Sequence, residues 1–166
     1  MSPVGIVLSV PDRPRPLHDT GSMQIERITR ADDELVAALA RLLPQLNPTS
    51  PLPTREDLAL MLAGPSTYLL MARASDLDPD VVGTLTLTLF RTLVGLQGRI
   101  NTVIVDTAAR GRGIGEALTR EAVRICRAAG VRRITLSSRL DRVAAHRLYL
   151  RVGFELTGSR QFHLML

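Results

Sequence analysis

The chain has 166 residues, of which 45% are hydrophobic and 22% are charged, a balance typical of a globular domain. Its single cysteine, Cys126, excludes an internal disulfide and a cysteine-based zinc site, and no apolar run approaches the ~20 residues of a membrane span. We therefore expect one soluble domain in a reducing, cytoplasmic compartment.

The formal net charge of +5 is unevenly distributed along the chain. Residues 1–98 carry 8 arginines and 11 acids, whereas residues 99–166 carry 13 arginines and 5 acids. This surplus predicts an anionic partner for the C-terminal part, such as a nucleotide, a nucleic acid or an acidic cofactor. All 21 basic residues are arginine, so there is no lysine for a Walker-type phosphate loop or a Schiff base.

The N-terminal half begins with an extension and continues as a strand and two helices. Four prolines before Gly21-Ser22 predict an N-terminal extension over residues 1–22, with the domain itself over 23–166. Alternating polar and apolar residues predict a strand at 24–29, and apolar residues at helical spacing predict a helix at 30–43. Prolines between 44 and 53 then predict a loop, before a capping-box-like start at Thr54 and a helix to about Ala63.

The remaining elements alternate between strands and helices. Residues 67–73 and 81–90 predict a hairpin, with Leu85, Leu87 and Leu89 on one face. Residues 91–99 are expected to connect it to a strand at 100–105. The other predicted elements are a helix at 113–129, a strand at 132–138, a helix at 141–151, and strands at 154–157 and 160–166.

Three glycines at alternate positions, Gly111, Gly113 and Gly115, lie where the strand at 100–105 leads into the next helix. Glycine lets backbone N–H groups approach a ligand closely, because no Cβ stands in the way. Together with the unpaired N–H groups and the positive dipole end of the helix, these residues form a cradle for phosphate. A tight turn without a ligand is the alternative. A dinucleotide fingerprint fits poorly, because Leu118 stands where its third small residue would be.

A second motif indicates which phosphate ligand this is. Arg110, Gly113 and Gly115 follow the pattern Arg-x-x-Gly-x-Gly, and residues 144–154 read Ala-Ala-His-Arg-Leu-Tyr-Leu-Arg-Val-Gly-Phe. Together they resemble the GNAT superfamily of acetyl-CoA-dependent N-acetyltransferases, over residues 23–166 in element order and most specifically over 100–154. The resemblance implies an α/β fold with a mixed, mostly antiparallel sheet. Its parallel fourth and fifth strands would splay apart to admit the pantetheine arm of coenzyme A.

The resemblance also implies site residues. In such proteins the fourth strand binds pantetheine through its backbone, and N–H groups at the next helix start bind the pyrophosphate. The corresponding positions are Val103, Ile104, Val105, Arg110, Gly111, Arg112, Gly113, Ile114, Gly115 and Glu116. Tyr149 resembles the family's general acid, which protonates the departing coenzyme A thiolate. The alternative for Tyr149 is an aromatic residue of the core.

The general base is not identified by the resemblance. Family members often carry a glutamate on the fourth or fifth strand, where this chain has Asn101, Thr102 and Ser137, none of which is a base near neutral pH. The helix position often filled by asparagine, seven before the tyrosine, is Arg142. The remaining candidates are a chain of water molecules and the side chains of Glu26, Asp106 and His163.

We therefore predict a metal-free acetyltransferase in which an amine of a small molecule or peptide attacks acetyl-CoA directly, in a ternary complex. The acceptor pocket is expected among residues 43–54, residues 91–99 and the last strands. A non-catalytic coenzyme-A-binding module on the same fold is the main alternative, because the expected carboxylates are missing. A nucleic-acid-binding domain ranks last, since three Phe, two Tyr and no Trp leave few stacking platforms. A homodimer through residues 162–166 or the N-terminal extension is one arrangement that the family suggests.

Overall fold

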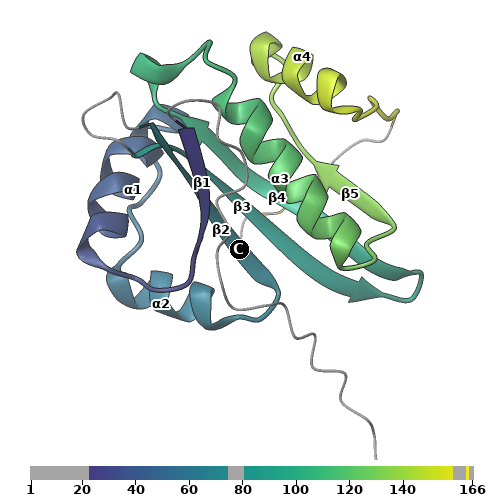
Figure 1. Ribbon diagram of the computed structural model, residues 1–166, viewed down its shortest axis with the longest axis horizontal. Coiled ribbons are helices and arrows are strands. Elements are labelled where there is room, and N and C mark those ends of the chain that lie inside the picture. The colour runs from purple at the N-terminus through teal and green to yellow at the C-terminus, as the bar shows by residue number, and fades with distance from the viewer. Residues whose placement is uncertain (1–22, 75–80, 159–163, 165–166) are drawn as a thin grey trace, which may run out of the picture.

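Five strands form one sheet in the computed structural model, which describes residues 23–74, 81–158 and 164 (Figure 1). The strands are β1 (Met23–Ile28), β2 (Thr67–Ala74), β3 (Val81–Thr92), β4 (Gly95–Val105) and β5 (Arg133–Leu136). The helices are α1 (Asp33–Leu46), α2 (Arg55–Ala63), α3 (Ile114–Ala128) and α4 (Val143–Val152), with a short 3-10 helix η1 (Thr107–Ala109). The strands follow sequence order, and all neighbours are antiparallel except the parallel pair β4–β5. The predicted mixed α/β fold is thus confirmed.

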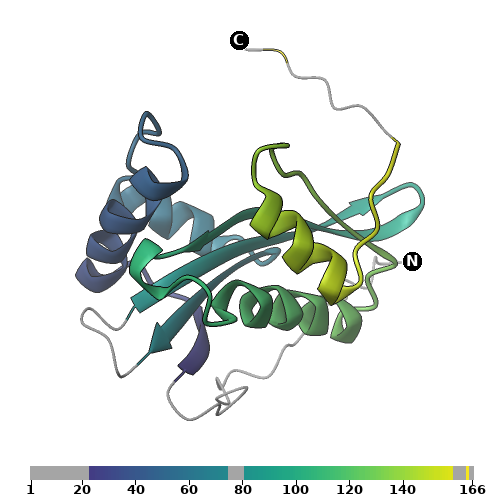
Figure 2. The same cartoon turned by 90° about the horizontal axis from the view of Figure 1, so that it is seen from above.

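Helices cover both faces of the sheet, with α3 on one face and α1 and α2 on the other (Figures 1 and 2). The apolar stripe of α3 packs against the three leucines of β3, which share one face as predicted. The buried residues of this contact are Leu85, Leu87, Leu89, Ile114, Leu118, Ala122 and Cys126. Burial raises the pKa of the Cys126 thiol to about 11, so this residue acts as a small apolar core residue.

Capping hydrogen bonds start both α1 and α2, and the one at α2 was predicted. Asp32 precedes α1, and its carboxylate accepts a hydrogen bond from the Leu35 N–H at 2.9 Å. Thr54 and Asp57 form a reciprocal capping box at α2. Helix α1 nevertheless continues to Leu46 and takes Pro44 into its last turn, where a loop was predicted. Pro44 has no N–H to donate to the Ala40 carbonyl, and in the same turn Gln45 Nε2 donates to the Arg41 carbonyl at 3.2 Å.

The prediction of a connector at residues 91–99 is wrong. Strand β3 reaches Thr92 and β4 begins at Gly95, so only two residues form the turn, and Gly95 has a φ of +111°. Gly98 lies within β4, where a Cβ would come within 2.8 Å of the Cys126 sulfur. The sequence pattern made this glycine look like a turn residue, whereas its actual role is to let α3 pack closely on the sheet.

The strand predicted at residues 154–157 is also absent. Helix α4 ends at Gly153, which has a φ of +104°, and residues 154–158 form no strand. The Phe154 ring instead folds back edge-on against Tyr149, with ring centroids 6.0 Å apart, and contacts the core. The predicted extension at 1–22 and, apart from Leu164, the strand predicted at 160–166 lie outside the described residues. Within the described ranges, no helix has the length and apolar character needed to cross a membrane.

The α3 packing yields a stability prediction from two helical leucines. Leu118 is fully buried between α3 and the sheet, whereas Leu60 on α2 is 76% exposed. Leu118→Ala should lower the free energy of unfolding by about 2–5 kcal/mol, because it removes apolar contact and leaves a cavity. Leu60→Ala should change it by less than about 0.5 kcal/mol. Urea unfolding followed by circular dichroism measures both, and equal effects would contradict this packing.

Candidate functional site

Strand β4 separates from β5 part way along its length. The parallel pairing runs only from Gln97 opposite Arg133 to Ile100 opposite Leu136, while β4 continues to Val105. A bulge lies at the point of separation, because Leu87 of β3 pairs with Ile100 and the preceding Thr86 pairs with Thr102, so that Asn101 is skipped. Such a bulge bends the strand and increases its twist. The predicted splaying of the two strands is confirmed, and the backbone of 101–105 has no strand partner on this side in the described chain.

A cavity of about 870 Å³ lies at this separation, within the size range of small-molecule sites. Four parts of the chain line it, namely the free part of β4, the turn into α3, the segment after β5 with α4, and the end of α1. The described lining residues are 45, 46, 48, 100–105, 109–111, 113–116, 136–139, 141–145, 148, 149 and 151.

The predicted site residues gather in this one cavity. Tyr149 and all the predicted cofactor-binding residues except Arg112 line it, that is Val103, Ile104, Val105, Arg110, Gly111, Gly113, Ile114, Gly115 and Glu116. Their individual roles stay predictions. Of the predicted acceptor walls, the end of α1 and the following Pro48 line the cavity, but the hairpin residues 91–99 do not. Lining residues to which the sequence analysis gave no site role include Ala109, Leu136, Ser138, Arg139, Asp141, Val143, Leu148 and Arg151.

The three glycines of the turn have two different structural roles. Gly111 and Gly113 have φ values of +81° and +80°, and no atom lies within 4 Å of a Cβ built on either. Gly113 caps α3 without a side-chain hydrogen bond, so the N-cap residue itself leaves the first N–H groups of the helix unsatisfied. At Gly115, a Cβ would lie 2.9 Å from the Leu148 side chain, so this glycine lets α4 approach α3. Free donors and open space together fit an anionic ligand such as the pyrophosphate of coenzyme A.

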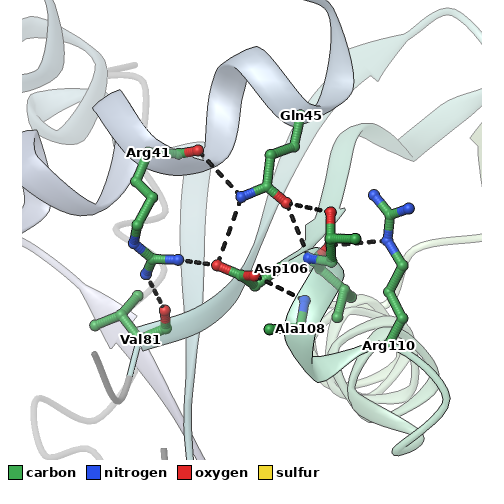
Figure 3. A network of polar contacts seen from close by, with 8 residues as sticks. Arg41, Gln45, Val81, Asp106, Ala108 and Arg110 are labelled. Atoms are coloured by element: carbon green, nitrogen blue, oxygen red, sulfur yellow. Dashed lines mark hydrogen bonds and ion pairs between the residues drawn. The ribbon is translucent and has the colours of Figure 1, made fainter. Parts of the chain in front are cut away.

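A polar network fixes the base of this turn to α1 (Figure 3). The Asp106 carboxylate caps η1 by accepting from the Ala108 N–H at 3.0 Å, and it also binds the guanidinium of Arg41. Gln45 accepts from the Thr107 N–H at 2.9 Å and from its hydroxyl at 2.8 Å. Asp106 is therefore engaged in holding the turn, which leaves it unsuited to act as the general base.

A second polar network ties α4 to the start of α3. The Glu116 carboxylate accepts from Arg120 at 2.8 Å and from Arg151 of α4 at 3.0 Å. These hydrogen bonds, the one from Arg120 foremost, hold the pKa of the Glu116 carboxyl below its ordinary value. Glu116 is thus ionised and neutralised by arginines, and its backbone N–H is the part suited to bind an anion.

Tyr149 lies on α4 with its ring partly buried against Phe154. Burial raises the pKa of its phenol above the ordinary value, and the positive charge of Arg142 opposes part of that rise. The phenol is therefore protonated at neutral pH and can donate a proton or a hydrogen bond into the cavity.

The cavity offers no free carboxylate as a general base among the described residues. Its two acids, Glu116 and Asp141, are both hydrogen-bonded to arginines. Glu26 lies outside the lining and binds Arg73 at 2.6 Å. His163 lies outside the described residues.

Comparison with known proteins gives matches to acetyltransferases. The model of the acetyltransferase (GNAT) family matches residues 33–154. The N-alpha-acetyltransferase RimI of Mycobacterium tuberculosis (strain ATCC 25618 / H37Rv) is 33% identical over 144 residues, which cover 86% of this chain and 85% of that protein.

Solved structures share the fold at lower identity. An aminoglycoside acetyltransferase, meta-AAC0020 from an uncultured soil metagenomic sample, matches with a TM-score of 0.78 at 20% identity, over 89% of this chain and 98% of its own. Glucosamine-6-phosphate N-acetyltransferase from Arabidopsis thaliana matches with a TM-score of 0.71 at 16% identity, over 86% of this chain and 98% of its own. At these identities the likeness extends to the fold alone.

The Asp106 network predicts a difference between two aspartates that pair with arginines. The Asp106 side chain is only 15% exposed, whereas that of Asp33, which pairs with Arg55 at 3.2 Å, is 94% exposed. Asp106→Ala should lower the free energy of unfolding by about 1–3 kcal/mol, since it removes a cap and leaves the Arg41 guanidinium with the Val81 carbonyl but without its carboxylate partner. Asp33→Ala should have a much smaller effect. Urea titration of both variants measures this, and a negligible loss for Asp106→Ala would contradict the network.

The environment of Tyr149 predicts how its phenol titrates. In the Tyr68→Phe variant Tyr149 is the only tyrosine, and the chain has no tryptophan, so tyrosinate absorbance reports on it alone. Its midpoint should lie above the ordinary tyrosine pKa of about 10. The unfolded chain then releases this proton first, so the stability due to the protonated phenol is intact below about pH 10 and falls as the pH rises further. A midpoint below the ordinary value would contradict the burial of this phenol.

Proposed function

This chain belongs to the acetyltransferase (GNAT) family, and we propose that it transfers the acetyl group of acetyl-CoA to an amine of a small molecule or peptide. One observation carries the proposal. The unpaired backbone of β4, the glycine turn and Tyr149 line the same cavity. Together they supply a groove for an extended arm, donors for phosphate and a phenol for the leaving group.

The chain's own backbone does most of the binding. Val103, Ile104 and Val105 offer main-chain groups to the amides of the pantetheine arm, as an added strand would use them. The N–H groups from Gly113 to Glu116 hold the pyrophosphate at the positive end of α3, and Arg110 adds charge beside them. Bound acetyl-CoA supplies an activated acetyl group as a thioester.

Transfer requires one bond to form and one to break. The acceptor amine, in its neutral form, attacks the thioester carbonyl carbon, so that a C–N bond forms, the C–S bond breaks and the amine loses a proton. Tyr149 donates its phenol proton or a hydrogen bond to the departing sulfur. Water accepts the amine proton, because the described lining has no free carboxylate. Holding both reactants together in one cavity lowers the barrier further.

A non-catalytic coenzyme-A-binding module is the second candidate. One observation favours it, namely that arginines engage both acids of the described lining. Such a module would use the same backbone cradle and would have no need of a proton acceptor or of the Tyr149 phenol. Both candidates therefore predict binding of acetyl-CoA, but only the acetyltransferase predicts release of free coenzyme A.

A matched pair of tyrosine variants tests the proposal. The parent protein should release free thiol from acetyl-CoA with at least one member of a panel of amines and peptides. Tyr149→Phe should lower kcat by about 100-fold and leave acetyl-CoA affinity within about twofold, since only the proton donor is lost. Tyr68→Phe is the control, because Tyr68 lies outside the cavity, beneath the Arg27 guanidinium.

Three results would contradict the proposal in different ways. Unchanged turnover in Tyr149→Phe would refute the role of the phenol while leaving acetyl transfer intact. Thermal stabilisation by acetyl-CoA without thiol release from any amine would favour the binding module. The absence of any stabilisation by acetyl-CoA would refute both candidates.

A further inference from the structure

Arg142 connects the start of α4 with the end of α1 across the cavity. Its Nη2 donates to the Leu46 carbonyl at 3.0 Å, although the two residues are 96 positions apart in the sequence. Both residues line the cavity. This hydrogen bond uses one of the five guanidinium N–H donors, and Arg142 forms no ion pair with any residue that the structure describes.

The described lining of the cavity carries more positive than negative charge. It contains Arg110, Arg139, Arg142 and Arg151 and the acids Glu116 and Asp141. Arg120 and Arg151 bind Glu116, and Arg139 binds Asp141 with Nε 3.2 Å from Oδ1. A cationic group on an acceptor would therefore lose hydration in this cavity without meeting a free carboxylate.

Arg142 also lies away from the proposed phosphate end of the cavity. Arg110 directly precedes the glycine turn, and Arg151 is bound to Glu116 in the first turn of α3, so these two arginines belong to that end. Arg142 instead donates to the Leu46 carbonyl, and its positive charge acts to lower the pKa of both the Tyr149 phenol and the neighbouring Asp141 carboxyl. Leu46, Arg142 and Tyr149 line the same cavity, and in the proposed complex Tyr149 marks the thioester end, where the acceptor amine must arrive.

We infer that the acceptor is an anionic amine, whose carboxylate or phosphate binds the free donors of Arg142 while its amino group faces the thioester. The inference rests on the proposed acetyl transfer and names its substrate class. A guanidinium fork held at one edge by Leu46 can still present parallel N–H groups to an acid. The reaction leaves this acid group unchanged and converts the amine to an amide, with free coenzyme A as the other product.

Two matched sets of acceptors test this inference. The first set is 4-aminobutyrate, 4-aminobutanamide and 1,4-diaminobutane, and the second is the C-terminally amidated peptides Ala-Asp-Gly, Ala-Asn-Gly and Ala-Lys-Gly. Each set keeps the amine and changes one group from anionic to neutral to cationic. In the set that the parent protein acetylates, kcat/KM should be highest for the anionic member. In Arg142→Met, its advantage over the neutral member should fall by about 10- to 100-fold, mainly through KM.

Two further variants separate recognition from folding. Arg142→Lys should keep part of the preference, because it retains the charge without the fork. Arg147→Met is the matched control on α4, since Arg147 is exposed and lies outside the cavity lining, and it should keep the parental preference. Thermal unfolding and acetyl-CoA affinity of all variants show whether the cavity is intact.

The outcomes decide between distinct explanations. If kcat/KM were highest for a cationic or neutral acceptor, in these sets or among all amines that the protein acetylates, the inference would be overturned. Acetyl transfer itself would still stand. An equal loss of kcat for all acceptors in Arg142→Met would also overturn it, because Arg142 would then act on the leaving group. If no amine of any charge released coenzyme A, acetyl transfer itself would fail and the inference with it.

Discussion

The early end of the β4–β5 pairing is the feature on which the rest of the site depends. Pairing stops at Ile100 opposite Leu136, and the bulge at Asn101 turns β4 away from its neighbour. Strands inside a sheet normally form hydrogen bonds on both sides. Residues 101–105 of β4 have no strand on the β5 side, so their N–H and C=O groups that face this side need another hydrogen-bond partner. The structure provides room for one, because α3 and α4 enclose a cavity beside this part of β4 and leave it accessible. The acetyl-CoA binding that we propose depends on backbone geometry more than on particular side chains.

Polar contacts between distant parts of the chain hold the walls of this cavity. Asp106 and Gln45 fix the turn before α3 to α1 (Figure 3). Glu116 joins α3 to Arg151 of α4. Arg142 joins α4 to the end of α1. The contacts of Arg41 with Asp106 and of Arg142 with Leu46 are partly buried, whereas those of Gln45 with Thr107 and of Arg151 with Glu116 are exposed. All of them form within the chain itself and join the walls of the cavity to one another.

Much of the fold could be predicted from residues whose pattern has a local cause. The leucines of β3, the stripe of α3 and the capping box of α2 follow from periodicity and from local hydrogen bonds. Gly98 was misleading, because its role is close packing against Cys126 and not a turn. The strand expected at 154–157 does not form, because the apolar Phe154 packs on the Tyr149 ring of α4 instead of pairing in the sheet. The bond from Arg142 to Leu46 could not be predicted, because only the folded chain brings these residues together.

The central claim is that the backbone beside the cavity binds acetyl-CoA, and backbone amide exchange measures this directly. Hydrogen exchange should be followed by NMR on the full chain, with and without acetyl-CoA. Bound acetyl-CoA should slow exchange at cavity-facing amides among 103–105 and at 113–116, with little change in α2 on the far side of the sheet. Unchanged exchange at 113–116 under saturating acetyl-CoA, or protection confined to other elements, would contradict it.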